Sequence, residues 1–137
     1  EYKSLINDVT LWDVAAERQV EVVGEDAAKF VQYLTPRNLS TFKDGFCRYA
    51  FLTDENGGII NDPLILKFND RKFWLSIADS DALLWCKGVA LSGNFRVQIS
   101  EPEACPVSLQ GPKSKDLMAK ATNNSPEVMN LKYYEFV

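Results

Sequence analysis

The chain has 137 residues, of which 46% are hydrophobic and 25% charged, and its formal net charge is −4. This balance is typical of one compact globular domain, and it provides no basic field that would favour binding to nucleic acid. No apolar run approaches the roughly 20 residues of a membrane helix, and no signal peptide is visible. We therefore expect a cytoplasmic protein without a nucleic-acid or membrane partner.

The hydrophobic pattern predicts strands and helices in alternation. Strands are indicated by apolar residues at every second position, and helices by apolar residues at i, i+3, i+4 and i+7. The expected elements are a strand over 19–23, a helix over 25–34, strands over 46–53, 59–68 and 73–77, a helix over 80–91, a strand over 95–99, and a short helix after Pro112. This order favours an α+β fold, with helices packed on one face of a mainly antiparallel sheet.

The pattern weakens after Ala121. The stretch 123–126, Asn-Asn-Ser-Pro, has the composition of a linker, and 133–137 looks like a strand cut off before its partner. We therefore predict one domain over 1–122, followed over 123–137 by a linker and the start of a truncated segment.

The types of residue present limit the chemistry. The chain contains no histidine, which excludes Ser-His and Cys-His catalysis within these residues and every histidine-based metal motif. Cys47, Cys86 and Cys105 are far apart, so we expect three reduced, buried thiols. The aspartates match no metal-binding loop, and no metal is predicted.

The predicted hairpin raises a question of its own. Asn56-Gly57-Gly58 has the residue types of a tight turn, but the second arm is then interrupted by Asn61, Asp62 and Pro63. Asp and Asn are poor strand formers, and Pro cannot donate to a ladder. Asp62 is either a turn residue that satisfies backbone groups or a functional carboxylate held at a strand end.

Three other features have both a structural and a functional interpretation. The segment 79–81, Asp-Ser-Asp, fits the N-cap of the next helix, and 110–113 could meet an anion with its backbone amides. Trp85 falls on the apolar stripe of the second long helix and is expected in the core. Trp12 and Trp74 stay open as walls of a cation site.

Two stretches, RYAFLTDENGGIINDPLILKF over 48–68 and LQGPKS over 109–114, resemble the folate-binding aminomethyltransferase family, whose best-known member is the T-protein of glycine cleavage. The resemblance runs from about Val9 to Phe136. Within the family, LWDVAAERQVEV, GGIINDP and FWLSIADSDALLWCKG resemble the dimethylsulfoniopropionate demethylase branch. The family resemblance implies that residues 1–122 are part of a folate-binding domain.

The resemblance also implies site residues and an activity. Asp62 would hydrogen-bond tetrahydrofolate and be essential for transfer, and Tyr49 and Leu64 would line the same pocket. Asp62 and Leu64 are two apart on one predicted strand, so both should point to one face. The implied reaction moves a methyl group from dimethylsulfoniopropionate, or a related small sulfonium, to tetrahydrofolate. The alternatives are aminomethyl transfer from a lipoyl carrier protein and a non-catalytic folate-binding assembly factor.

The chain also departs from the T-protein pattern. Asn61-Asp62-Pro63 replaces a typical Asp-Asp-Leu, and Ala78 falls where the family has a folate-contacting Asn, which favours the demethylase branch. The family's Gly-Tyr-x-Gly-Glu segment, which completes the folate site, is not among these residues. We therefore expect the 137-residue segment alone to bind tetrahydrofolate weakly or not at all, which would leave it inactive, and to self-associate, most simply as a homodimer.

Overall fold

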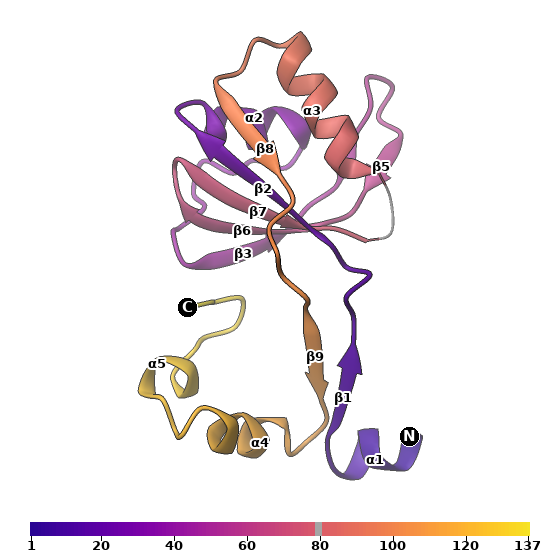
Figure 1. The fold of residues 1–137 in the computed structure, drawn as a ribbon, viewed down its shortest axis with the longest axis vertical. Coiled ribbons are helices and arrows are strands. Elements are labelled where there is room, and N and C mark those ends of the chain that lie inside the picture. Colours follow the sequence, from indigo (N-terminus) through magenta and orange to yellow (C-terminus); the bar gives the residue numbers. More distant parts are fainter. Residues whose placement is uncertain (79–80) are drawn as a thin grey trace. The chain divides into compact units, whose positions relative to one another are not determined.

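The computed structural model describes residues 1–78 and 81–137, which form two compact units (Figure 1). The sheet unit comprises residues 16–104, and the terminal unit comprises 1–15 and 105–137. In chain order the elements are α1 (Tyr2–Asn7), β1 (Thr10–Asp13), β2 (Gln19–Gly24), α2 (Ala27–Leu34), β3 (Phe46–Tyr49), β4 (Leu52–Thr53), β5 (Ile59–Asn61), β6 (Leu64–Asn69), β7 (Lys72–Ser76), α3 (Ala82–Ser92), β8 (Val97–Ser100), β9 (Val107–Gln110), α4 (Ser114–Ala121) and α5 (Pro126–Met129).

The sheet unit is built on a five-stranded sheet in the order β3-β6-β7-β2-β8, and every neighbouring pair is antiparallel. Helices α2 and α3 bury their apolar stripes against the inward-facing residues of the strands. The largest fully buried side chains are Phe30, Leu52, Ile65, Leu75, Val20, Val22, Val31, Pro63 and Cys86. The predicted α+β fold, with helices on one face of a mainly antiparallel sheet, is confirmed.

The period of two along the strands separates the two faces of this sheet. Val20 and Val22 are buried under the helices, so Glu21 between them points to the opposite face. On β7, Phe73 and Leu75 are buried in the same core, and Trp74 between them shares the opposite face with Glu21. This opposite face, which we call the open face, carries partly exposed polar and aromatic side chains.

The predicted hairpin is present, and its turn has the expected chemistry. The amide of Gly58 donates to Oδ1 of Asp54 at 2.7 Å, and the amide of Asp54 donates to the carbonyl of Gly58 at 2.9 Å. Gly57 adopts a φ of +82°, which L-residues with side chains rarely adopt. Gly57 is therefore required by the turn.

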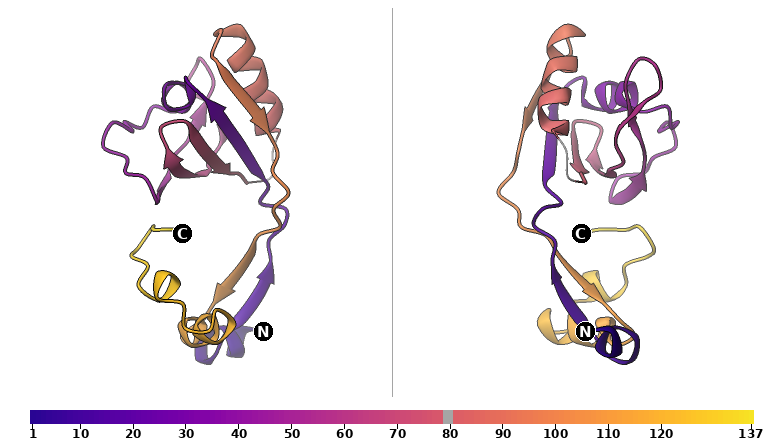
Figure 2. Two further views of the ribbon diagram at one scale, coloured as in Figure 1. Left: turned by 60° about the vertical axis from the view of Figure 1, so that its left-hand side comes forward. Right: turned by 90° about the vertical axis from the view of Figure 1, so that its right-hand side faces the viewer.

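The terminal unit consists of the two-stranded antiparallel ladder β1-β9 with α1, α4 and α5 (Figure 2). The ladder joins residues about 100 positions apart, with Leu11 opposite Leu109. Sequence patterns did not indicate either strand. The predicted strand over 133–137 is wrong, because Tyr133 and Tyr134 form a turn and Tyr134 has a φ of +60°.

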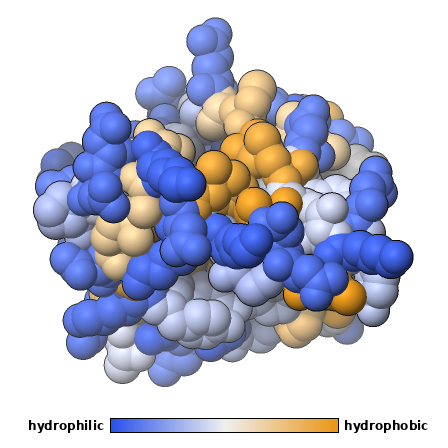
Figure 3. Space-filling model, turned by 90° about the horizontal axis from the view of Figure 1, so that it is seen from below, coloured by the Kyte–Doolittle hydropathy of each residue, from blue (hydrophilic) through white to orange (hydrophobic). Residues whose placement is uncertain are grey.

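Several large hydrophobic side chains of the terminal unit are exposed. Figure 3 shows one face of the molecule, on which apolar side chains lie uncovered among hydrophilic ones. The exposed large hydrophobic residues of this unit are Tyr2, Ile6, Leu11, Trp12, Val107, Leu117, Met118, Tyr133, Tyr134 and Val137. Within the described residues, none of the helices is both long and apolar enough to cross a membrane.

Candidate functional site

The second arm of the hairpin is broken at Asp62 and Pro63, which lie between β5 and β6. The expectation that Asp62 and Leu64 share one strand is therefore wrong. Pro63 has no N–H to continue the ladder, although its carbonyl still accepts a hydrogen bond from the amide of Ala50 at 3.0 Å. The hairpin consequently splits into two ladders, β4-β5 near the turn and β3-β6 in the main sheet.

Asn61 has a structural role at this break. Its Nδ2 donates to the carbonyl of Ala78 at 3.2 Å, and its Oδ1 accepts from the amide of Ala78 at 3.2 Å. The side chain is only 5% exposed, so these bonds satisfy both ends of a buried amide. Asn61 thereby ties the end of β5 to the segment that follows β7.

Asp62 is half-buried, and its carboxylate contacts the side chain of Tyr49. The phenolic O–H of Tyr49 donates to Oδ2 of Asp62. The tyrosine is itself held in place, because its carbonyl accepts from the guanidinium of Arg37 and its ring packs edge-on against Phe51 with centroids 5.7 Å apart. Tyr49 is 41% exposed, so part of its ring is accessible to a ligand.

Leu64 completes the predicted set. It lies directly opposite Tyr49 in the β3-β6 ladder, and cross-strand partners of this kind have adjacent side chains on one face. On the other side Leu64 is opposite Ser76, whose Oγ accepts from Nε2 of Gln19 at 2.9 Å. The structure therefore brings Tyr49, Asp62 and Leu64 together at one end of the sheet.

A second polar group on the open face was not predicted. The carboxylate of Glu21 accepts from Nε1 of Trp74 at 2.7 Å and pairs with the ammonium of Lys72 at 2.8 Å. The hydrogen bond from Lys72, followed by that from Trp74, lowers the pKa of Glu21 below its usual value. Nζ of Lys72 also lies 5.8 Å from the ring centroid of Trp74 and 5.1 Å from that of Phe68. The cation next to the ring of Trp74 is therefore the ammonium of Lys72, from the same strand.

The remaining candidates have contacts of their own. Nε1 of Trp12 donates to Oγ1 of Thr10 at 2.8 Å. In the segment 110–113, the backbone amide of Lys113 donates to the backbone carbonyl of Asp8 at 3.0 Å. The ammonium of Lys113 also pairs with the carboxylate of Asp8 at 3.1 Å. Of the predicted cap at 79–81, residues 79–80 lie outside the described residues, and Asp81 is the N-cap residue of α3 but makes no side-chain capping hydrogen bond. Across the described residues, no three His, Cys, Asp or Glu side chains are placed to hold a metal ion.

Burial of the cysteines differs from the expectation of three buried thiols. Cys86 is buried, Cys47 is half-buried and Cys105 is exposed. Burial raises the pKa of the Cys86 thiol to about 12 and also raises that of Cys47. Both thiols are therefore poor nucleophiles at neutral pH.

Comparison with known proteins places the chain in a family. Residues 1–137 match the family described as the GCVT N-terminal domain. The chain is 37% identical over 128 residues to the dimethylsulfoniopropionate demethylase DmdA of Ruegeria pomeroyi, covering 93% of this chain and 35% of that protein. It is 32% identical over 123 residues to an aminomethyltransferase of Clostridium botulinum strain Okra, covering 88% of this chain and 33% of that protein.

A solved structure has the same fold. The glycine cleavage system aminomethyltransferase T of Bartonella henselae superimposes with a TM-score of 0.86 at 23% sequence identity, over 98% of this chain and 37% of that one. The chain belongs to the GCVT N-terminal domain family. It spans about a third of the length of the curated relatives described above.

Proposed function

We propose that the protein carrying this chain transfers a one-carbon group to tetrahydrofolate, and that Tyr49, Asp62 and Leu64 form part of its folate site. The observation that carries the proposal is the contact between Tyr49 and Asp62 beside Leu64. We further propose that residues 1–122 belong to the folate-binding domain and 123–137 to the segment that follows it.

The residues at this site are chemically suited to a pterin. The pterin ring is flat and carries several N–H donors, so it needs an ionised acceptor and an apolar wall. Asp62 supplies the acceptor: Tyr49 donates one hydrogen bond to its Oδ2, and Oδ1 has no hydrogen-bond partner among the described residues. Leu64 is partly exposed and supplies an aliphatic surface next to it. The acceptor and the apolar surface present at this site therefore fit the cofactor.

The roles of the three side chains follow from these contacts. Tetrahydrofolate, when bound, supplies the nitrogen that accepts the one-carbon group. Asp62 accepts hydrogen bonds from ring N–H groups and fixes the tilt of the ring. Tyr49 holds the carboxylate in one orientation, and Leu64 keeps water from the ring face. Alignment of this kind contributes up to roughly 7–11 kcal/mol to lowering a transfer barrier.

We propose a sulfonium such as dimethylsulfoniopropionate as the methyl donor. Support comes from the 37% identity to a protein named as the demethylase, against 32% to one named as an aminomethyltransferase. A sulfonium is already a good leaving group, so the reaction requires no strong general acid. The positive charge disperses as the methyl group moves, and an apolar site does not oppose that change.

Aminomethyl transfer is the second candidate, because several relatives carry the name aminomethyltransferase. The deciding experiment supplies the full-length protein with tetrahydrofolate and either dimethylsulfoniopropionate or an aminomethylated lipoyl carrier protein. We expect methyltetrahydrofolate from the first mixture and no methylenetetrahydrofolate from the second. The reverse result would assign aminomethyl transfer. Folate binding without product in either mixture would leave the assembly-factor alternative.

A further inference from the structure

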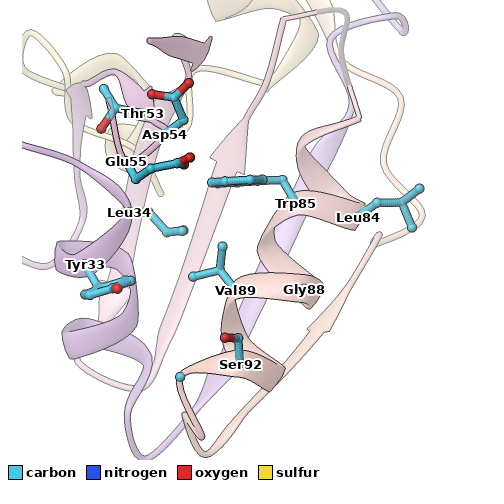
Figure 4. Close-up of a pocket in the computed structure, with 11 residues that line it drawn as sticks. Tyr33, Leu34, Thr53, Asp54, Glu55, Leu84, Trp85, Gly88, Val89 and Ser92 are labelled. Atoms are coloured by element: carbon cyan, nitrogen blue, oxygen red, sulfur yellow. The ribbon is translucent and has the colours of Figure 1, made fainter. Parts of the chain in front are cut away.

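A cavity lies in the sheet unit, and neither Tyr49, Asp62 nor Leu64 lines it. Its volume is about 570 Å³, within the range of small-molecule sites. It is open to solvent on one side and is bordered by α2, α3 and the turn between β4 and β5 (Figure 4). The lining residues of the cavity are Tyr33, Leu34, Thr53, Asp54, Glu55, Leu84, Trp85, Gly88, Val89, Ser92 and Gly93.

The lining combines aromatic and acidic groups without a basic one. Tyr33 and Trp85 come from α2 and α3, and their rings provide faces of negative potential. Asp54 is held rigidly, because its Oδ1 accepts from the amides of Asn56 at 2.9 Å and Gly58 at 2.7 Å. Figure 4 shows the carboxylate of Glu55 pointing toward the ring of Trp85. Aromatic faces beside carboxylates attract organic cations.

The indole N–H of Trp85 is an independent sign of a ligand. Trp85 packs against the hydrophobic core and also lines the cavity, so its predicted core position is only part of its environment. Its Nε1 is buried and is the one buried side-chain nitrogen or oxygen atom, among the described residues, that has no hydrogen-bond partner. Buried donors are nearly always satisfied. An acceptor oxygen on a ligand in the cavity would satisfy this one once the indole, whose ring lines the cavity, turns to expose Nε1.

We propose that the cavity binds a small organic cation, an ammonium or guanidinium, that also carries a hydrogen-bond acceptor oxygen. The cation lies between Glu55 and the aromatic rings, and the oxygen accepts from Nε1 of Trp85. A neutral carbonyl suits this position better than a carboxylate, because Asp54 and Glu55 repel a second anion. This inference does not depend on the proposed transfer to tetrahydrofolate.

Three related compounds test the two halves of this recognition. N-acetylputrescine has both an ammonium and a carbonyl, N-butylacetamide lacks the ammonium, and butylamine lacks the carbonyl. Each is titrated into the ¹⁵N-labelled protein while the indole N–H resonances are followed, that of Trp85 being assigned with Trp85→Phe. We expect N-acetylputrescine to move the Trp85 resonance downfield in a saturable way. Both partial compounds should bind at least about tenfold more weakly. Equal binding of N-butylacetamide would overturn the role of the carboxylates. No saturable shift with N-acetylputrescine would overturn the proposal.

Variants separate recognition from folding. Glu55→Gln should weaken binding of N-acetylputrescine about fivefold, as expected for loss of an exposed charge partner, whereas Glu103→Gln, which is exposed but does not line the cavity, should not. Gly88→Leu provides a steric test, because a Cβ at Gly88 meets no atom within 4 Å and a larger side chain enters the cavity. We expect Gly88→Leu to abolish binding with unchanged or raised thermal stability. Unchanged affinity in a folded Gly88→Leu protein would place the ligand elsewhere and overturn the proposal.

Discussion

Asn61 and Ala78 are joined by two hydrogen bonds, each 3.2 Å long, between the side-chain amide of one and the backbone of the other. The two residues are 17 positions apart in the chain, and Asn61 directly precedes Asp62. Asn61 therefore does for Ala78 what a neighbouring strand would do, at a point where Pro63 prevents a ladder from continuing. An amide at this position is explained by the fold, while the carboxylate next to it remains available for function.

The first prediction concerns this amide. Asn61→Ala removes both bonds and leaves two backbone groups of Ala78 without these partners, so we expect a loss of about 1–3 kcal/mol in the free energy of unfolding. Urea denaturation measures the loss. Asn7→Ala is the matched control, because Asn7 is exposed and bonds only to a nearby carbonyl, and its effect should stay within about 0.5 kcal/mol. Equal midpoints for the two variants would show that the Asn61 pair contributes nothing.

The second prediction concerns the proposed folate site. In the full-length enzyme, Asp62→Ala should lower the rate of transfer to tetrahydrofolate about 100-fold or more, because the ring loses its fixed acceptor. Tyr49→Phe should give a smaller loss of about tenfold, since it frees the carboxylate without removing it. Product formation is measured with tetrahydrofolate in excess, and circular dichroism verifies the fold. Asp116→Asn, on the surface of α4, is the control. A folded Asp62→Ala protein with near-normal turnover would exclude Asp62 from the site.

Local sequence chemistry predicted the turn and the interruption near Asp62, whereas Tyr49 and Leu64 were named from the family resemblance. The Asn56-Gly57-Gly58 turn joins the two hairpin arms, but the register shifts between Leu52 and Thr53, so the turn alone does not place Tyr49 opposite Leu64. The break at Pro63 was visible because proline lacks a donor. These features depend on residues close together in the chain, where turn geometry and strand period decide the outcome.

Contacts between distant segments could not be predicted in the same way. The pairing of Glu21 with Trp74 requires β2 to lie beside β7, and the hydrophobic pattern of each strand is compatible with several partners. The β1-β9 ladder joins segments about 100 residues apart and has no turn that would reveal it. Trp85 was predicted in the core from helical spacing, but spacing does not show that the residue also lines a cavity.

The third prediction is a pH dependence of stability that arises from Glu21. Lys72 and then Trp74 lower the pKa of Glu21 in the folded state below its usual value of 4.5. Ionised Glu21 therefore stabilises the fold fully above about pH 4.5, and this contribution disappears as the pH falls through the lower, folded pKa. We expect the melting temperature of the native chain to fall more steeply with acid than that of Glu21→Gln. Thermal melts from pH 3 to 7 test this, with Glu103→Gln as control. Parallel curves for the native chain and Glu21→Gln would contradict it.

The last prediction concerns self-association of the 137-residue chain. Leu11 and Val107 lie on one face of the β1-β9 ladder, and their side chains are 66% and 63% exposed. Exposed apolar side chains on a two-stranded ladder tend to find a partner. We expect light scattering to give the mass of a two-fold dimer for the native chain, and a monomer for Leu11→Glu/Val107→Glu. Leu91→Glu changes an even more exposed leucine on α3 and should leave the dimer intact. A native chain that stays monomeric at high concentration would refute the prediction, and a dimer unaffected by the double substitution would place the interface elsewhere.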